Sequence, residues 1–210
     1  NTFWDWTLPT SRRINDILSR TALNQQVFQL QNSAPALENL DIPAYQWLND
    51  DLHGLRRHTG TSFPNGNALG ASWSPETLSD VGKAIAVEAR AIHHFYTNLG
   101  QRGVDDGYWN GIGMTIYAPN INLVRDPRWG RAQEVYSEDP LLTSTLVEGY
   151  VNGMQETEDG YLRAAACCKH YAAYDVESFP TTRYFYDAKV DGRNMWETYL
   201  PAFYACTAKA

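Results

Sequence analysis

Several residues of this chain have side chains that form strong hydrogen bonds to a hydroxylated ligand, and each comes shortly after an apolar run. They are Asp50, Asp51, Arg131, Lys169 and His170. Charge-assisted hydrogen bonds from carboxylates, ammonium groups and guanidinium groups are strong and directional. The residue types therefore predict a site for the hydroxyls of a sugar, provided that the fold brings these segments together.

Each of these residues also has a structural interpretation, which the residues alone leave open. An aspartate such as Asp50 or Asp51 often accepts backbone N–H groups where a turn or helix begins. A lone histidine such as His170 is more often structural than functional. The charged residues of one segment have a structural alternative, an internal ion-pair network that consists of Arg125, Asp126, Arg128 and Arg131. In it we expect Arg128 to pair with Asp126 or Glu138. The histidines interpreted as structural are His53, His58, His93 and His94.

Four stretches carry apolar residues at helical spacing, namely 10–24, 75–98, 140–155 and 193–209. Ser74 and Asp139 are the expected N-caps of the second and third stretches, and a proline follows each cap at the first helical position. Pro201 must kink or interrupt the fourth helix, because proline lacks the N–H donor.

Short β-prone runs alternate with these helices, at 45–48, 61–63, 114–117 and 164–168. Strands that alternate with helices predict a parallel α/β sheet. Ligands of such sheets bind at the carboxyl ends of the strands, which is where the polar residues lie. No internal domain boundary is visible, so residues 1–210 are expected to form one unit.

The composition excludes several classes of partner. The formal net charge is −7 without any basic segment, which argues against nucleic acid, and no apolar run approaches the length that inserts into a membrane. A neutral oligosaccharide or glycoside is compatible with this charge. The 27 aromatic residues (7 Trp, 13 Tyr and 7 Phe) suit stacking against sugar rings, although core packing accounts for most of them.

We expect no metal and no cofactor. Nucleotide-binding glycine motifs are absent, and the turn at Asp105-Asp106-Gly107 lacks the further ligands of a calcium loop.

Three cysteines, Cys167, Cys168 and Cys206, are too few for a disulfide scaffold. The adjacent pair is interpreted as buried thiols rather than a bridge.

Six segments carry a family resemblance when they are taken together and in order. They are YQWLNDDLHG (45–54), TSFP (61–64), APNINLVRDPRWGR (118–131), YSEDP (136–140), CCKHYAAYD (167–175) and ETYLPAF (197–203). The chain resembles glycoside hydrolase family 3, and is most similar to its β-xylosidase and α-arabinofuranosidase branch. The likeness runs over nearly the whole chain.

The resemblance implies a partial (β/α)8 barrel, roughly its first half, in a retaining exo-acting enzyme that hydrolyses terminal β-linked sugars. It further implies xylan breakdown in the extracellular space or secretory pathway. By the resemblance, the residues that bind the substrate are Asp50, Tyr117, Arg131, Lys169 and His170. Asp50 stands where the xylosidase branch usually has glutamate, so β-glucosidase specificity remains an alternative.

The two carboxylates of a retaining glycosidase have no match in residues 1–210. The family's nucleophile lies in a Ser-Asp-Trp or Ser-Asp-Cys context, whereas the single Ser-Asp here is Ser79-Asp80, within an expected helix. We assign neither catalytic role to Glu134, Asp175 or Glu177. We therefore expect the nucleophile and acid/base downstream, and an inactive isolated chain.

Two alternatives to this enzyme part stay open. One is a non-catalytic half-barrel, structural or carbohydrate-binding, that pairs with another chain; the weaker one is an incomplete product without a stable fold. A half-barrel exposes sheet edges and an uncovered core face. We therefore expect a complementary polypeptide, or a C-terminal continuation, to cover them.

Overall fold

The structure is a computed structural model of the chain, and it describes residues 2–101, 111–158, 160–178, 180–208 and 210. The turn expected at residues 105–107 lies outside the described residues. Within these ranges, no helix combines the length and the apolar character needed to cross a bilayer.

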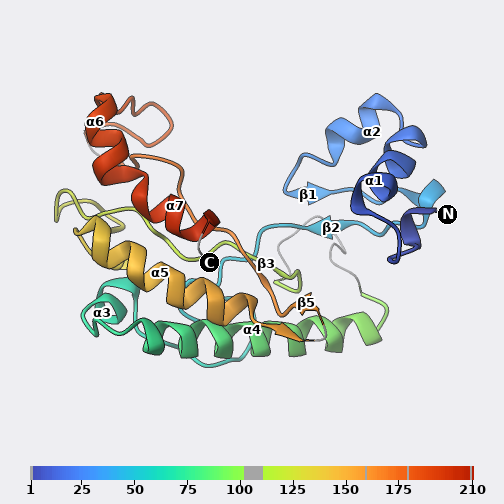
Figure 1. Cartoon of the computed structure of the whole chain (residues 1–210), viewed down its shortest axis with the longest axis horizontal. Helices are drawn as coiled ribbons and strands as arrows, with labels where there is room; N and C mark the ends of the chain where they lie inside the picture. Colours follow the sequence, from blue (N-terminus) through green and yellow to red (C-terminus); the bar gives the residue numbers. More distant parts are fainter. Residues whose placement is uncertain (1, 102–110, 159, 179, 209) are drawn as a thin grey trace.

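Two long helices, α4 (Pro75–Asn98) and α5 (Pro140–Gln155), lie side by side and form the base of the molecule (Figure 1). Both have the predicted bounds and caps. Ser74 Oγ accepts the Thr77 N–H at 3.1 Å, and Asp139 Oδ1 accepts the Leu142 N–H at 2.8 Å. Each cap satisfies a backbone donor that the first helical turn leaves free, which is why local sequence was enough to find both starts.

Glycines allow α4 and α5 to approach closely. A Cβ atom at Gly82 would collide with the Tyr150 carbonyl, and one at Gly153 would collide with the Ser79 carbonyl. The main apolar core lies at this interface and includes Leu78, Ile85 and Tyr150, each fully buried.

Above these helices, short parallel strands position the polar segments. Strand β3 (Thr115–Ile116) pairs in parallel with β6 (Ala165–Ala166), and α5 connects them. Parallel bridges join Asn49 to Ile116 and Asn120 to Lys169. The order strand, α4, strand, α5, strand is the predicted α/β alternation, and it brings the residues after each strand to one edge.

Two of the four expected strands differ from prediction. The run at 45–48 contributes β2 (Tyr45–Gln46), which pairs antiparallel with β1 (Ser33–Ala34) before Asn49 turns to the parallel sheet. The run at 61–63 is not a strand. The backbone N–H of Thr61 donates to the Glu88 carboxylate on α4, at 2.9 Å from Oε2, instead of joining a ladder.

The predicted helix 10–24 is two helices, α1 (Thr10–Ser19) and α2 (Leu23–Phe28). The Thr21 hydroxyl donates to the Ile17 carbonyl at 3.0 Å, and the Gln25 side chain accepts the Ala22 N–H at 2.9 Å. These side-chain bonds compete with a continuous helix and end it between residues 19 and 23.

The C-terminal helix is interrupted at Pro201, as predicted. It begins as α6 (Gly192–Asn194), continues as the π-helical segment η4 (Met195–Tyr199) and ends as α7 (Pro201–Ala208). The remaining elements are η1 (Thr2–Trp4), η2 (Glu38–Leu40), α3 (Gly66–Gly70), η3 (Ala132–Glu134), β4 (Thr157–Glu158) and β5 (Tyr161–Leu162).

The cysteine prediction was wrong for one of the adjacent pair. Cys168 forms a disulfide with Cys206, and Cys167 is a free, half-buried thiol. The partner lies on α7, 38 residues further along the chain. Adjacent residues in an extended segment point in opposite directions, so Cys168 faces α7 while Cys167 faces away from it.

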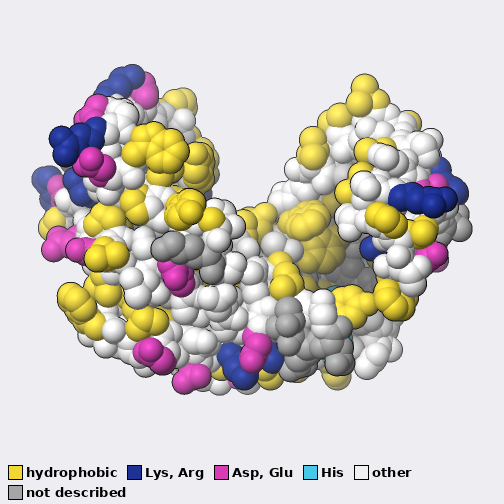
Figure 2. Space-filling model, in the orientation of Figure 1, with side chains coloured by type: hydrophobic (Ala, Val, Ile, Leu, Met, Phe, Trp, Pro, Cys, Tyr) yellow, Lys and Arg dark blue, Asp and Glu magenta, His cyan; other side chains and the backbone are white. Residues whose placement is uncertain are grey.

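Apolar side chains are exposed at both ends of the molecule. Figure 2 shows a hollow between the end that carries α1 and α2 and the end that carries α6 and α7, with apolar groups along its walls. Large apolar residues that are more than seven-tenths exposed include Trp6, Leu23, Leu30, Phe185 and Trp196. Many large apolar side chains exposed on one molecule are typical of faces that another polypeptide covers.

Candidate functional site

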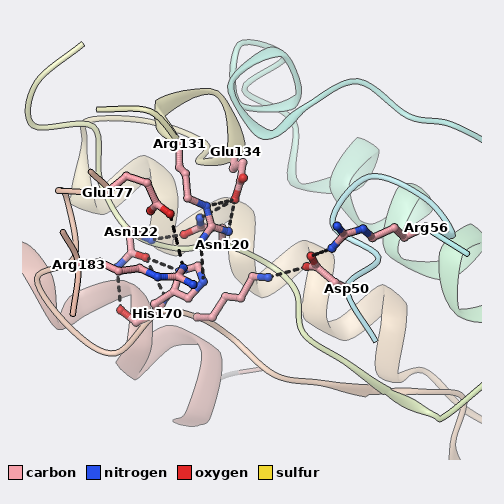
Figure 3. Close-up of polar contacts among 10 residues, drawn as sticks. Asp50, Arg56, Asn120, Asn122, Arg131, Glu134, His170, Glu177 and Arg183 are labelled. Carbon is pink, nitrogen blue, oxygen red and sulfur yellow. Dashed lines mark hydrogen bonds and ion pairs between the residues drawn. The ribbon is translucent and has the colours of Figure 1, made fainter. Parts of the chain in front are cut away.

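Asp50 and Lys169 form an ion pair at the edge where the parallel strands end. The Lys169 Nζ atom lies 2.7 Å from Asp50 Oδ1, and Arg56 Nη1 lies 2.7 Å from Asp50 Oδ2 (Figure 3). The Asp50 and Lys169 side chains are 20% and 12% exposed, whereas Arg56 is 53% exposed. The carboxylate is therefore held on the protein side by a buried cation and on the other side by a surface cation.

The charge state of Asp50 follows from these contacts. Burial alone raises the pKa of its carboxyl, but the Lys169 hydrogen bond and charge, with Arg56 and Arg131 nearby, lower the pKa below its ordinary value. Asp50 is thus an anion with its oxygens available as hydrogen-bond acceptors. Its neighbour Asp51 has the structural role: Oδ1 accepts the Arg56 N–H at 2.9 Å.

Arg131 is held between an acid and an imidazole. Its Nε and Nη2 atoms donate to Glu134 Oε2, at 2.9 and 2.5 Å, and its Nη1 atom lies 3.2 Å from His170 Nε2 (Figure 3). Asn120 Nδ2 donates to the same Glu134 oxygen at 3.3 Å. The guanidinium is therefore fixed in orientation, with N–H groups left for a ligand.

His170 is held through both its backbone and its ring. Asn122 is 3% exposed, and its side-chain amide bonds to the backbone N–H and the carbonyl of His170. Burial lowers the pKa of His170 most strongly, and the charges of Arg131, Lys169 and Arg183 lower it further, to about 3. The imidazole is consequently neutral at neutral pH.

All five residues predicted to bind the substrate line one cavity of about 940 Å³. Tyr117 lies on its wall, half-buried, and burial raises the pKa of its phenol. Further aromatic walls come from Tyr171, Tyr174, Tyr184 and Tyr186. Aromatic faces beside a few fixed charged groups are suited to a sugar, which has apolar C–H faces and hydroxyl edges.

A second, more polar cavity of about 600 Å³ adjoins the first, and Asp50 and Arg131 line both. Its other polar walls come from Arg56, Ser62, Asn65 and further residues of the 52–65 and 130–134 segments. Asp50 and Arg131 therefore lie at the boundary between the two cavities.

Among the residues with a structural interpretation, His53 lines the smaller cavity, and those described next lie outside both cavities. Arg128 pairs with Asp126, as expected, with Nε 2.9 Å from Oδ1, and this pair is exposed. Arg125 instead lies over the Tyr199 ring, 5.7 Å from its centroid. His93 Nδ1 lies 2.8 Å from the Ile112 carbonyl, a structural contact. Across the described part of the chain, no group of three or more metal-ligating side chains comes together.

The profile of the Glycosyl hydrolase family 3 N terminal domain matches residues 108–205 of this chain. A β-xylosidase/α-L-arabinofuranosidase of Medicago sativa is 39% identical over 95% of the chain, and an exo-1,4-β-xylosidase of Emericella nidulans is 34% identical over 98%. The chain belongs to glycoside hydrolase family 3. It spans about a quarter of the length of these relatives, 26% and 27%.

Solved structures of family 3 enzymes share the fold. The chain aligns over 99% of its length with 26% of a family 3 exo-β-xylosidase in complex with a xylobiose aziridine probe, at 29% identity and a TM-score of 0.83. It aligns over 92% with 25% of a β-glucosidase of Bifidobacterium adolescentis, at 28% identity and a TM-score of 0.73. The family prediction and its likeness to the xylosidase branch are confirmed.

Sequence reasoning missed the residues that hold this family 3 site in shape. They are Arg56, Asn120, Asn122 and Glu134. Asn120 and Asn122 lie in the APNIN segment, directly after β3, so the position after a strand was the available signal. Glu134 follows Arg131 by three residues, a spacing at which opposite charges pair within one helical turn, so this spacing was the available signal for Glu134.

Proposed function

We propose that this chain supplies the sugar-binding part of a retaining, exo-acting β-glycosidase that hydrolyses terminal β-linked sugars, with xylosides as the preferred class. The proposal rests on one observation, the convergence of Asp50, Tyr117, Arg131, Lys169 and His170 on a single cavity. These residues come from four separate parts of the sequence, and their charges are oriented by partners on the protein side. The segments that carry them are the first half of a (β/α)8 barrel.

The nucleophile and the acid/base come from polypeptide outside these 210 residues. The other acids at or around the cavity already have partners. Asp187, which lines the cavity, pairs with Lys189. Glu134 holds Arg131, and Glu177 lies 3.7 Å from Arg183. Asp175 Oδ2 lies 3.5 Å from the Tyr199 hydroxyl. Sugar binding without turnover is accordingly the expected behaviour of the chain by itself.

A complementary polypeptide, as a continuation of the chain or as a separate chain, covers apolar side chains that this chain leaves exposed. The exposure of Trp6, Leu30 and Phe185 supports this proposal. A non-catalytic half-barrel paired with another chain is the alternative, and it predicts sugar binding without turnover even when the partner is present.

The protein works in the extracellular space or the secretory pathway. The Cys168–Cys206 disulfide supports this location, because such bonds persist in oxidising compartments.

The direct experiment measures calorimetric affinity for xylose, glucose and methyl β-xyloside together with turnover of aryl β-xyloside and β-glucoside. We expect Arg131→Ala to weaken sugar binding about tenfold or more, because it removes a charge-assisted donor. Arg128→Ala is the matched control, since Arg128 also pairs with a carboxylate, that of Asp126, but at the surface and away from the cavity. Loss of affinity in both variants, or no binding by the wild type, contradicts the proposed site. Turnover by the chain alone contradicts the placement of the catalytic carboxylates.

A further inference from the structure

Asn122 has only one possible orientation of its side-chain amide. Its Nδ2 atom donates to the His170 carbonyl at 2.9 Å, and its Oδ1 atom accepts the His170 backbone N–H at 2.8 Å. A carbonyl oxygen only accepts and a backbone N–H only donates, so exchange of the amide oxygen and nitrogen would break both bonds. Asn122 is buried, and water does not compete for these contacts.

This orientation assigns the proton on the His170 ring. The Nδ1 atom of His170 lies 3.2 Å from the same Asn122 Oδ1. That oxygen cannot donate, so Nδ1 must carry the hydrogen. A neutral imidazole has one N–H, so Nε2 then carries a lone pair.

The lone pair on Nε2 meets a donor. Arg131 Nη1 lies 3.2 Å from His170 Nε2, and a guanidinium only donates. Burial and the surrounding cations keep His170 neutral, which agrees with this arrangement. On its other side Arg131 donates twice to Glu134, so the guanidinium is held in its plane from two directions.

We infer that Asn122 and His170 are positioning residues: Asn122 selects the Nδ1–H tautomer of His170, and the Nε2 lone pair of that tautomer aims Arg131 into the cavity. Both ring nitrogens of His170 lie within hydrogen-bond distance of protein groups, so His170 orients Arg131 in addition to lining the cavity itself. This inference rests on the proposed function for its binding consequences, but the tautomer itself does not depend on any ligand.

The first test is ¹⁵N NMR of the chain labelled at histidine, without sugar, with His170→Gln used to assign the ring signals among the five histidines. The expected result is a protonated Nδ1 and an unprotonated Nε2 that stay unchanged from pH 8 to pH 5. A protonated Nε2, or a ring that titrates near pH 6.5, overturns the inference whatever the chain binds.

The second test measures affinity for methyl β-xyloside. We expect His170→Phe to weaken binding about tenfold, because Arg131 loses its acceptor, and His170→Gln to recover part of that loss through an amide oxygen near the Nε2 position. Equal losses in the two variants overturn the positioning role. We expect Asn122→Ala to leave His170 as a mixture of its two tautomers and, for that reason, to weaken sugar binding.

Failure of the inference and failure of the proposed function have different signatures. A chain with the Nδ1–H tautomer that binds no sugar contradicts the proposed function and upholds the assignment of His170. A chain that binds sugar but carries the Nε2–H tautomer upholds the function and overturns the inference. If Asn122→Ala fails to fold, the wild-type tautomer and the two His170 variants still decide the matter.

Discussion

The ammonium of Lys169 lies 2.7 Å from the Asp50 carboxylate, although 119 residues separate the two in the chain. The bond joins the ends of two strand segments, since Asn49 bridges to Ile116 and Lys169 bridges to Asn120. Both partners line the large cavity. One ion pair therefore joins two sides of the cavity. The same pair keeps the Asp50 carboxyl, which lines the cavity, in its anionic form.

Replacement of Lys169 by methionine should change both properties. Burial then raises the pKa of Asp50 without the Lys169 bond and charge to oppose it, so the pKa of the Asp50 carboxyl increases. Sugar affinity should fall tenfold or more, by about 1.4 kcal/mol or beyond. Carboxyl ¹³C NMR titration and calorimetry measure the two effects. Lys83→Met is the control, because Lys83 pairs with Glu156 at the surface, and it should change neither.

The buried carboxyl of Asp51 should make the stability of the fold depend on pH. Burial first, and the Asp50 charge next, raise its pKa from 3.8 to about 6. Because the folded-state pKa is raised, the stability that Asp51 contributes is fully present below pH 3.8 and is lost as pH rises through about 6. Asp51→Asn keeps an oxygen for the Arg56 N–H without the charge. The advantage of Asp51→Asn over the wild type in unfolding free energy should therefore grow by up to about 3 kcal/mol as the pH rises from 4 to 8.

Urea unfolding at the two pH values, wild type against Asp51→Asn, checks this difference. The exposed acid Asp80 supplies the control, and Asp80→Asn should show no comparable gain. A larger gain for Asp51→Asn at pH 4 than at pH 8 would contradict the burial argument.

The Cys168–Cys206 disulfide should contribute stability through chain entropy. It closes a loop of 38 residues, for which the loop-closure relation gives about 4 kcal/mol. Cys206→Ser should therefore lower the unfolding free energy by up to about this amount. Thermal unfolding with and without a phosphine reductant measures the effect. Cys167→Ser, which removes the free thiol, should unfold almost as the wild type does and should keep its sensitivity to reductant.

The contact between α4 and α5 should tolerate no side chain at Gly153. A Cβ atom there meets the backbone of Ser79, so Gly153→Ala should destabilise the fold by about 1–3 kcal/mol. Gly192→Ala is the matched control, because the added Cβ would lie more than 4 Å from every described atom outside its own helix turn and chain neighbours. Removal of glycine at such an open helical site should stabilise by about 0.4–1 kcal/mol. Equal effects of the two substitutions would show that helix contact does not explain the glycine at 153.

Local sequence was sufficient for the long helices. Ser74-Pro75 and Asp139-Pro140 predict the starts of α4 and α5 because caps act within one turn, and the apolar periodicity predicts the faces that become buried. The interruption at Pro201 was predictable for the same reason, because the missing N–H donor of a proline disrupts the helix locally, at the proline itself.

Local sequence was not sufficient where a distant partner competes. Thr61 has the β-propensity expected of a strand, but its N–H bonds to Glu88 on α4, 27 residues away. The adjacent cysteines looked like buried thiols, and a bridge forms because α7 brings Cys206 to Cys168, in the segment that follows β6.

The sequence by itself determined the family and the two central helices, because motifs and caps are readable from residue type and spacing. It also predicted, through the family resemblance, the five residues that we propose bind the sugar. Tertiary structure alone decided how those residues are used. It pairs Lys169 with Asp50 and places Asn122 where it selects the proton position on His170. Hydrogen bonds depend on distances of about 3 Å between groups far apart in the chain, and only the folded backbone sets such distances.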